Sequence, residues 1–326
     1  MNKKLDIIIP AYNAWDTLIR TLSSIAMQTL ASEIKVTIIN DGDPRGSYST
    51  IYKRFVDVLD IDEIILPENC GPGIAKQQGL DNTKADYIMF LDADDTLVNA
   101  FVLQHMLYGI VTNKACEIYG DWYIENENGE LETTQGKRTA INGGIYSRDF
   151  LSRFGIHFNA ARIHEDSFFA KYVEYYLQLY NLPTLHFEEK VMIYHYTPNS
   201  ICKSISDEDY SMEIIKSWFS NMKELIGILD AQKAKIYDFK LSCFIEMYMD
   251  YNYIYRTQKK RLNDLIALQK DFAQDVYREI PKVEDCIDKW EEIGKNDAVV
   301  LIDSDIRTLV PPVISFEDYV ALIQGE

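Results

Sequence analysis

The sequence of 326 residues predicts an α/β fold, a mostly parallel sheet flanked by helices, followed by a helical C-terminal region. Three observations predict this class. In the first third, short runs that are apolar throughout alternate with helix-like segments, as in sheets covered by helices on both faces. After residue 206 the pattern is helical, with few turn signals before Pro281 and Pro311. The hydrophobic content of 47% is ample for the core of such a fold.

Four apolar runs in the first third predict the parallel strands. They read LDIIIP at 5–10, KVTIIN at 35–40, DEIILP at 62–67 and YIMFLD at 87–92. Helix-like segments at 14–29, 48–59 and 73–83 separate them. In such sheets ligands bind outside the carboxyl ends of the strands, so the residues directly after each run are candidate site residues.

The pattern changes from about residue 117. Asn128 and Gly129 form a turn signal between polar flanks, which predicts a hairpin or a mobile flap. The stretch 143–158 predicts a short strand and a helix. The stretch 164–180 predicts a helix opened by acidic residues, and 190–202 predicts a last strand that leaves the core.

Composition limits the class of protein. The formal net charge of −18 disfavours broad binding to nucleic acid or to an anionic membrane surface. No window approaches the roughly 20 apolar residues of a membrane span, and the start lacks a signal-peptide pattern, so we expect a cytoplasmic protein without a transmembrane segment. Five scattered cysteines without CxxC spacing predict reduced thiols and no zinc site.

The run YIMFLDADD ends in three carboxylates, Asp92, Asp94 and Asp95. One interpretation is that Asp94 or Asp95 caps a helix beginning near Thr96. The other is that Asp92 and Asp94, which project to the same side of an extended segment, share a hard divalent cation. Carboxylates without nearby His or Cys suit Mg²⁺ or Mn²⁺, which use one or two carboxylates together with substrate phosphates. A diphosphate is the ligand that this second interpretation implies.

Six motifs follow one another in a recognisable order. IIIPAYN and IINDGD end the first two predicted strands, NCGPGIAKQQGL leads to FLDADD, and GGIYSRDFL and RIHEDSFFA come later. Over residues 5–200 this order resembles the family-two glycosyltransferases of GT-A fold, which are inverting and use nucleotide sugars. The resemblance implies a GT-A domain over 1–206, with a nucleotide-sugar-binding half at 1–116 and an acceptor-side half at 117–206. The helical C-terminal region would span 207–326.

The resemblance also implies a set of nucleotide and metal ligands. The residues assigned to the nucleotide are Pro10, Ala11, Tyr12, Asn13, Asp41, Gly71, Lys76, Asp92 and Ala93. Asp94 is the expected metal ligand, with Asp92 nearer the ribose or sharing the Mn²⁺ or Mg²⁺. Asp41 would accept a hydrogen bond from the imide of uracil or thymine, which favours UDP or dTDP donors.

Two departures from the family pattern are visible. Lys76 stands where the family usually has arginine, so a forked guanidinium becomes a point charge. The turn after the second strand reads Asn40-Asp41-Gly42-Asp43 instead of the commoner Asp-Asp-Gly-Ser, which leaves Asp41 as the plausible base-reading carboxylate.

Single displacement by an acceptor hydroxyl needs one general base. The resemblance places Asp166 there, with Glu165 as an alternative; both acids would otherwise complement the helix dipole. Other residues keep two interpretations each. His195 would bind metal or diphosphate, or pack in the core. His164 would tune the base or touch the acceptor, or lie on the surface.

Two further side chains are candidates for the sugar or acceptor. Asp95 would support the metal ligands or face the sugar. Trp122 would stack on a sugar ring or pack in the core.

The tail holds Arg256, Lys259, Lys260 and Arg261 close together in an acidic chain. They form a solvated helix face or meet an anionic partner, whether membrane, glycan or DNA. The tyrosines between Tyr237 and Tyr255 are expected to pack in a helical core or an oligomer surface.

The combined expectation is an inverting, metal-dependent transferase that moves a sugar from a UDP-type donor to a hydroxyl, on a glycan. Three alternatives remain: transfer to a modified nucleobase in DNA, a non-catalytic nucleotide-sugar-binding module, and a nucleotidyltransferase. The last would need a lysine-rich triphosphate loop, and none is found in the sequence.

Overall fold

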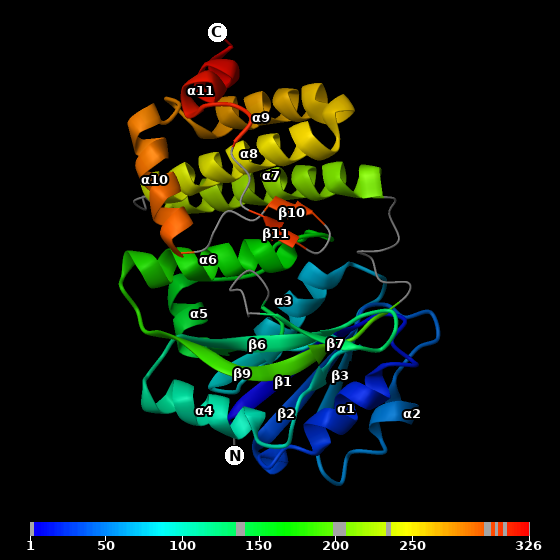
Figure 1. Ribbon diagram of the computed structural model, residues 1–326. Helices are drawn as coiled ribbons and strands as arrows, with labels where there is room; N and C mark the ends of the chain where they lie inside the picture. The colour runs from blue at the N-terminus through cyan, green and yellow to red at the C-terminus, as the bar shows by residue number, and fades with distance from the viewer. Residues whose placement is uncertain are drawn as a thin grey trace. The chain divides into compact units, whose positions relative to one another are not determined.

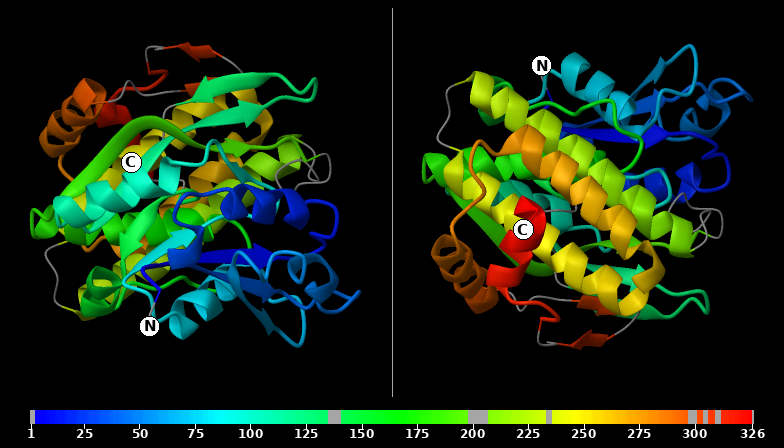
Figure 2. Two further views of the ribbon diagram at one scale, coloured as in Figure 1. Left: turned by 90° about the horizontal axis from the view of Figure 1, so that it is seen from below. Right: turned by 90° about the horizontal axis from the view of Figure 1, so that it is seen from above.

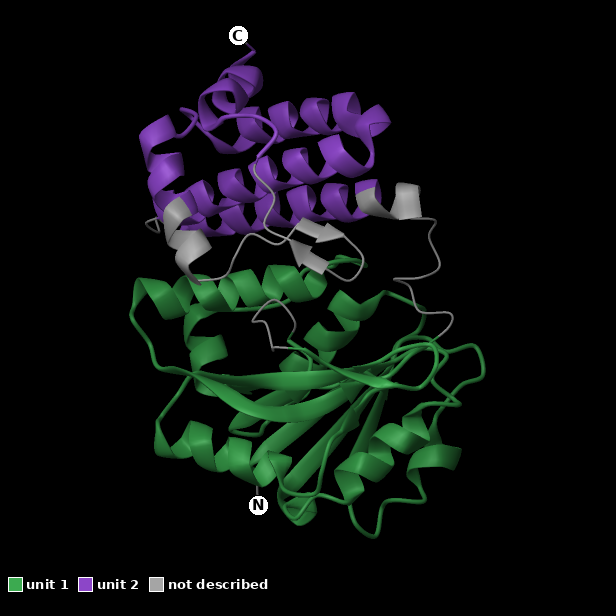
Figure 3. Cartoon of the chain, viewed as in Figure 1, with its two compact units in different colours: residues 1–203 green, residues 204–326 purple. Residues whose placement is uncertain are grey.

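The computed structural model divides into two compact units, residues 1–203 and 204–326 (Figure 3). The sequence-based boundary lies between residues 206 and 207. The residues that the structure describes are 3–134, 141–197, 207–232, 236–296, 301–303, 306–308 and 312–325. The end of the last predicted strand segment, from residue 198 to residue 202, lies outside them.

Four strands of the first unit form the predicted parallel sheet. In spatial order they are β3 (Asp60–Ile65), β2 (Ile34–Asn40), β1 (Leu5–Ala11) and β4 (Tyr87–Phe90). Every neighbouring pair among them is parallel, and Ile7 of β1 aligns with a residue of β2 on one side and of β4 on the other. The apolar runs therefore predicted both the strands and their direction.

Beyond β4 the sheet is mixed. It continues through β8 (Ile145–Ser147), β6 (Glu117–Glu125), β9 (Thr184–Tyr194) and β5 (Thr96–Leu97), with β7 (Leu131–Thr134) paired to β6. β8 runs antiparallel to both of its neighbours, whereas β6 and β9 are parallel. The β6–β7 pair is the hairpin predicted at Asn128 and Gly129, and Gly129 takes the positive φ of 78° that such a turn favours.

One face of this sheet is covered by α1 (Leu18–Ala26), α2 (Ser49–Tyr52) and α4 (Val102–Thr112) (Figures 1 and 2). The buried core on this side joins apolar residues of α1 and α4 to the inward side chains of the strands. The sequence analysis singled out no element at α4, although its buried side recurs at helical spacing, from Val102 and Leu103 to Met106.

The other face carries α3 (Pro72–Asn82), α5 (Arg148–Phe154) and α6 (Glu165–Leu179) (Figure 1). Phe90 at the end of β4 packs against the rings of Phe158 and Phe169, with centroid distances of 5.0 and 5.6 Å. This aromatic contact joins α6 and the segment before it to the sheet edge where the parallel strands end.

The helix expected over residues 48–59 is much shorter than predicted, because α2 ends at Tyr52. The chain then continues mostly in turns, with hydrogen bonds such as Phe55 N–H to the Tyr52 carbonyl at 2.9 Å. Phe55 and Leu59 still pack on the core, whereas Val56 and Val58 are half exposed.

The second unit is the predicted helical region. Its helices are α7 (Asp207–Ala231), α8 (Tyr237–Thr257), α9 (Leu262–Val276), α10 (Val283–Asn296) and α11 (Phe316–Gln324). A short antiparallel ribbon of β10 (Leu301–Asp303) and β11 (Ile306–Thr308) was not predicted.

Aromatic side chains build much of the core of this second unit. Tyr248 and Tyr251 of α8 are buried, as packing predicts, whereas Tyr237 at the start of α8 is more than half exposed. The buried Tyr319 hydroxyl donates to Gln269, which donates in turn to the Met247 carbonyl.

The described residues bear on three expectations drawn from the sequence: membrane spans, cysteines and the basic cluster of the tail. None of the helices among them is both long and apolar enough to cross a membrane. The four cysteines that they include are free thiols, and Cys202 lies outside them. Arg256, Lys259 and Lys260 are exposed near the end of α8, and their predicted anionic partner stays a prediction.

Candidate functional site

Two loops at the carboxyl ends of β2 and β3 are joined by Asp41. Its side chain is buried and accepts hydrogen bonds from the backbone N–H groups of Cys70 and Gly71 at 2.8 and 2.9 Å. Gly71 has a φ of 93°, which a side chain would strain, and it precedes Pro72 at the start of α3. Each carboxylate oxygen can accept a second hydrogen bond, so the predicted contact of Asp41 with a base stays open.

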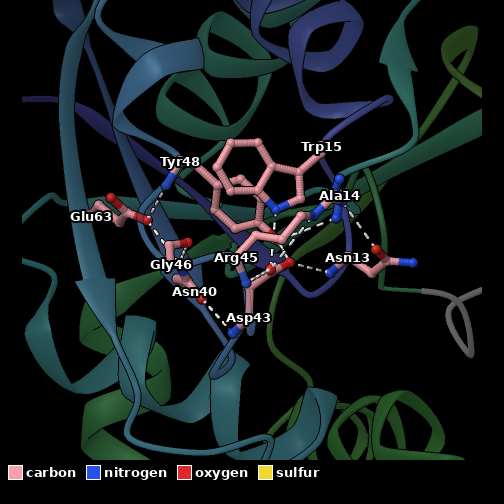
Figure 4. Close-up of polar contacts among 9 residues, drawn as sticks. All are labelled: Asn13, Ala14, Trp15, Asn40, Asp43, Arg45, Gly46, Tyr48 and Glu63. Carbon is pink, nitrogen blue, oxygen red and sulfur yellow. Dashed lines mark hydrogen bonds and ion pairs between the residues drawn. The ribbon is translucent and has the colours of Figure 1, made fainter.

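A second carboxylate, Asp43, ties the loop after β1 to the loop after β2 (Figure 4). It accepts hydrogen bonds from the Asn13 N–H, the Trp15 indole N–H, the Arg45 N–H and the Tyr48 hydroxyl, at 2.6 to 3.1 Å. Burial alone would raise the pKa of Asp43, but these four donors lower it below its ordinary value. The carboxylate therefore stays ionised and holds both loops in place.

This cluster shapes the place where the sequence predicts a nucleotide base. The Arg45 guanidinium lies over the Trp15 ring at 4.9 Å, and Trp15 packs against Tyr48. Tyr12, the predicted base-stacking residue, is 50% exposed directly before Asn13. An exposed ring beside a rigid loop is available for stacking, whereas the neighbouring Ala11 is buried in the core.

The acidic cluster after β4 is braced by Asn142. Its side-chain amide donates to Asp92 at 3.2 Å and to Asp95 at 2.6 Å, and its carbonyl accepts the Asp92 N–H at 2.9 Å. Asp95 also accepts the His195 N–H at 3.0 Å and has no exposed surface. This arrangement agrees with support of the neighbouring carboxylates, and a direct contact of Asp95 with a sugar, which stays a prediction, would require the side chain to become exposed.

Asp94 is held by both its backbone and its side chain. Arg20 of α1 donates two hydrogen bonds to the Asp94 carbonyl, at 3.0 and 2.7 Å. The Thr197 hydroxyl donates to one side-chain oxygen at 2.7 Å, while Thr21 binds the carbonyl of Ala93. The backbone between Asp92 and Asp95 is therefore fixed from α1 on one side and from the end of β9 on the other.

The charges around Asp92 suit a bound cation. Burial raises the pKa of Asp92 to about 6; Lys76 opposes this shift, and Asp166 and Asp94 add to it. Among the described residues no three His, Cys, Asp or Glu side chains converge as a complete ligand set. Mg²⁺ and Mn²⁺ commonly take one or two carboxylates and complete their shell with water and phosphate, so Asp92 and Asp94 fit such an ion.

His195, the third predicted metal ligand, has both ring nitrogens engaged. Nε2 lies 2.8 Å from the Thr96 hydroxyl, and Nδ1 lies 2.9 Å from Glu125. The hydrogen bond with His195 lowers the pKa of Glu125 despite its burial. In this arrangement neither nitrogen faces a metal, and ligation would require the ring to leave one partner.

The candidate bases, Glu165 and Asp166, open α6 and meet Lys76 of α3. The Lys76 Nζ lies 2.8 Å from Glu165 and 2.5 Å from Asp166. The Lys76 side chain is 3% exposed and that of Asp166 is 29% exposed. Burial alone would lower the pKa of Lys76, but Asp166, Glu165 and Asp92 raise it well above its ordinary value.

The pKa of Asp166 is raised to about 6. Burial is the main cause, Lys76 opposes it and Glu165 adds to it. His164, the residue before the pair, takes a left-handed φ of 62°, and burial lowers its pKa. A histidine there is mostly neutral at pH 7.

Trp122 is partly buried and packs against the hydrophobic core shared with α1 and α4. This contact agrees with the core-packing interpretation, and the stacking of Trp122 on a sugar ring stays a prediction.

Sequence reasoning missed several residues that organise the site. The residues are Arg20, Asp43, Asn142, Arg162 and Thr197. Arg162 donates to the side chain and to the backbone carbonyl of Asn69, both at 2.8 Å, across a separation of 93 residues. Asp43 carried a usable signal, since it follows the second predicted strand, and so did Asn142, which precedes the glycine pair Gly143-Gly144 at a predicted strand start.

Comparisons with known proteins show which family and fold this chain resembles. Residues 6–166 match the sequence model of the family described as "Glycosyl transferase family 2". The chain is 31% identical over 128 residues to the glycosyltransferase GlyA of Streptococcus pneumoniae, covering 39% of this chain and 18% of that protein. It is 33% identical over 128 residues to the poly(ribitol-phosphate) β-N-acetylglucosaminyltransferase TarP of Staphylococcus aureus, covering 38% of each.

A solved structure resembles the whole fold. The structure of residues 1–349 of Staphylococcus aureus TarS in complex with UDP-GlcNAc aligns with a TM-score of 0.67 and 15% identity. The alignment covers 99% of this chain and 91% of that one. This similarity shows a GT-A-like fold with a helical C-terminal region, whereas the chain spans well under half the length of GlyA and TarP.

Proposed function

Because residues 6–166 belong to glycosyl transferase family 2, we propose that the protein transfers a sugar from a UDP-sugar to an acceptor hydroxyl, with a divalent cation and with inversion. One observation carries the proposal. Lys76 of α3 contacts Asp166 at the start of α6, at 2.5 Å, and Asp92, which follows β4, contributes to the raised pKa of the same lysine. Donor-side and acceptor-side acids therefore share one site.

The nucleotide would lie against the loops that Asp41 and Asp43 hold. Tyr12 offers an exposed ring for stacking on the base, and Asp41 offers carboxylate lone pairs to the imide N–H. An imide donor is present in uracil and absent from cytosine, which favours UDP.

Asp94 and Asp92 would hold Mn²⁺ or Mg²⁺. When bound, such an ion stabilises the negative charge that collects on the departing diphosphate. Asp94 keeps one side-chain oxygen outside its bond with Thr197, and Asp92 is oriented by Asn142. The role of His195 as a further ligand remains a proposal that requires its ring to move.

Asp166 is the proposed general base. Its side chain is 29% exposed, compared with 10% for that of Glu165, so Asp166 has an accessible oxygen for an acceptor hydroxyl. Removal of the hydroxyl proton on the face opposite the leaving diphosphate gives one displacement and an inverted anomeric centre. Glu165, buried against Lys76, serves to hold the start of α6.

The acceptor is proposed to be a hydroxyl of a glycan or a related polymer. The name of TarP, which describes transfer to poly(ribitol-phosphate), supports an acceptor of polyol-phosphate type. The basic residues Arg256, Lys259 and Lys260 are a candidate contact for such a polyanion.

The direct test is UDP release from a panel of UDP-sugars, with Mn²⁺, with Mg²⁺ and with EDTA, in the presence and absence of polyol-phosphate and neutral glycan acceptors. We expect one donor to be turned over with metal only. A measurable product would then show its anomeric configuration by NMR. Tight UDP binding without turnover of any donor under any acceptor would instead favour a binding module.

A further inference from the structure

We propose that Lys76 is a positioning residue that holds the Asp166 carboxylate ionised and aimed at the acceptor, instead of binding the nucleotide. The proposal rests on the proposed function, because it takes Asp166 as the base. The family usually has arginine at this position. The proposal places the lysine of this chain on the acceptor side of the site.

The contacts of Lys76 support this assignment. Its Nζ makes two ion pairs, at 2.8 Å to Glu165 and 2.5 Å to Asp166, and the side chain is 3% exposed. An ammonium has three donors, and two of them already point to the start of α6. Because the side chain is buried and two of its donors are engaged there, Lys76 is directed to the start of α6.

The backbone around Lys76 keeps this contact rigid. One helical turn earlier, an added Cβ on Gly73 would lie 2.3 Å from the Asn159 carbonyl oxygen. One residue later, Gln77 accepts the Phe158 N–H at 2.8 Å. The first turns of α3 thus lie directly on the segment that leads into α6, and Lys76 extends from the same surface to the base.

The charges that face Lys76 come from two elements. Glu165 and Asp166 belong to the start of α6, and Asp92 follows β4. His164 is the other titratable group beside the base, and burial keeps it mostly neutral. Lys76 therefore contacts two carboxylates and is influenced by a third, and its shortest contact goes to Asp166. Loss of the Lys76 charge leaves Asp166 beside two like charges, which favours its protonated form.

The test compares Lys76→Met with Lys76→Arg in the full chain. For Lys76→Met we expect kcat at saturating donor to fall about 10- to 100-fold while the KM for the donor changes less than about 3-fold. The acidic limb of the kcat profile should move up by about one pH unit, and Lys76→Arg should restore both quantities in large part. Lys84→Met, at an exposed lysine just after α3, is the matched control.

A second pair of variants keeps the proposal testable if Lys76→Met alone fails to fold. Lys76→Met combined with Glu165→Gln removes one positive and one negative charge, so the local net charge equals that of the wild type. This double variant is compared with Glu165→Gln alone. The acidic limb should still move up when Lys76 is removed in that background.

Two outcomes separate the two proposals. If Lys76→Met raises the donor KM and the UDP dissociation constant about 10-fold or more with an unchanged kcat and acidic limb, Lys76 binds the nucleotide and the inference is wrong. If Asp166→Asn keeps wild-type kcat, the base assignment itself fails, whatever Lys76 does.

Discussion

The Cα of Gly73 faces the Asn159 carbonyl so closely that an added Cβ would lie 2.3 Å from its oxygen and 2.8 Å from that of Ala161. Only a residue without a side chain lets α3 approach the segment before α6 at this distance. Because α3 carries Lys76 and α6 carries Asp166, this backbone contact sets the distance between Lys76 and Asp166.

The first prediction follows from this contact. Gly73→Ala should lower the free energy of unfolding by about 1–3 kcal/mol, because either backbone must shift. It should also lower kcat by displacing α6. Gly227→Ala is the control, since Gly227 is an exposed residue away from the ends of α7 and has open space around it. This variant should gain about 0.5–1 kcal/mol in the free energy of unfolding. Urea unfolding of both variants measures the difference; equal, small effects would show that the contact is not as close as described.

The second prediction concerns the hydrogen-bond cluster around Asp43. Tyr48→Phe removes a buried hydroxyl that donates to Asp43 at 2.6 Å and accepts the Ala14 N–H at 3.1 Å. We expect a loss of about 1.5–3 kcal/mol in unfolding free energy, as for hydrogen bonds to charged groups, and weaker UDP binding. Tyr108→Phe, at a tyrosine that is 73% exposed, should change stability by less than about 0.5 kcal/mol. Calorimetric unfolding with UDP titration distinguishes the two; unchanged UDP affinity in Tyr48→Phe would separate the cluster from the nucleotide.

The third prediction is the pH dependence of transfer. The pKa of Asp166 is raised to about 6, and the base acts in its ionised form. The rate should therefore be full well above pH 6 and fall about tenfold per pH unit below it. Asp166→Asn should lose about 100- to 10,000-fold in kcat while it still binds UDP.

The Glu165→Gln variant is the control for that profile. It removes a neighbouring negative charge, so the acidic limb should move to lower pH and kcat should fall less than in Asp166→Asn. A larger loss of kcat in Glu165→Gln than in Asp166→Asn would exchange the roles of the two acids.

The fourth prediction concerns Asn142. Asn142→Leu removes the donor shared by Asp92 and Asp95 and leaves both carboxylates without that partner. Turnover should fall, and the Mn²⁺ concentration needed for half-maximal activity should rise about 10-fold or more, as for supporting residues of metal ligands. A metal titration of activity checks it; an unchanged half-maximal Mn²⁺ concentration would contradict the role of Asn142.

The sequence predicted the parts of the site that follow from strand order. β1, β2 and β4 are largely apolar, and parallel strands end at one edge, so Tyr12, Asp41 and Asp92 were expected there. Lys76 was expected at the nucleotide, yet it pairs with acids about 90 residues later, because its direction depends on how α3 packs against α6. The local sequence pattern does not show how closely two helices so far apart in the chain pack together.

The remaining differences have similar causes. Asp95 and His195 each kept two interpretations, because their hydrogen bonds to Asn142, Glu125 and Thr96 join segments that only the folded chain brings together. Asp43 looked like a turn residue, and its four donors come from both neighbouring loops. The helix expected over residues 48–59 ends at Tyr52, and turns beyond it bring Phe55 and Leu59 onto the core.

The most direct test of the central claim is a calorimetric titration of UDP into the wild-type protein and into Asp94→Asn, with Mn²⁺ and with EDTA. A site made of the Asp41 loop and the Asp92-Ala93-Asp94 segment predicts UDP binding to the wild type that weakens at least about 10-fold when Mn²⁺ is removed or Asp94 is changed. Equal UDP affinity in all four conditions would contradict a metal-assisted diphosphate site, and no UDP binding in any condition would contradict the nucleotide site itself.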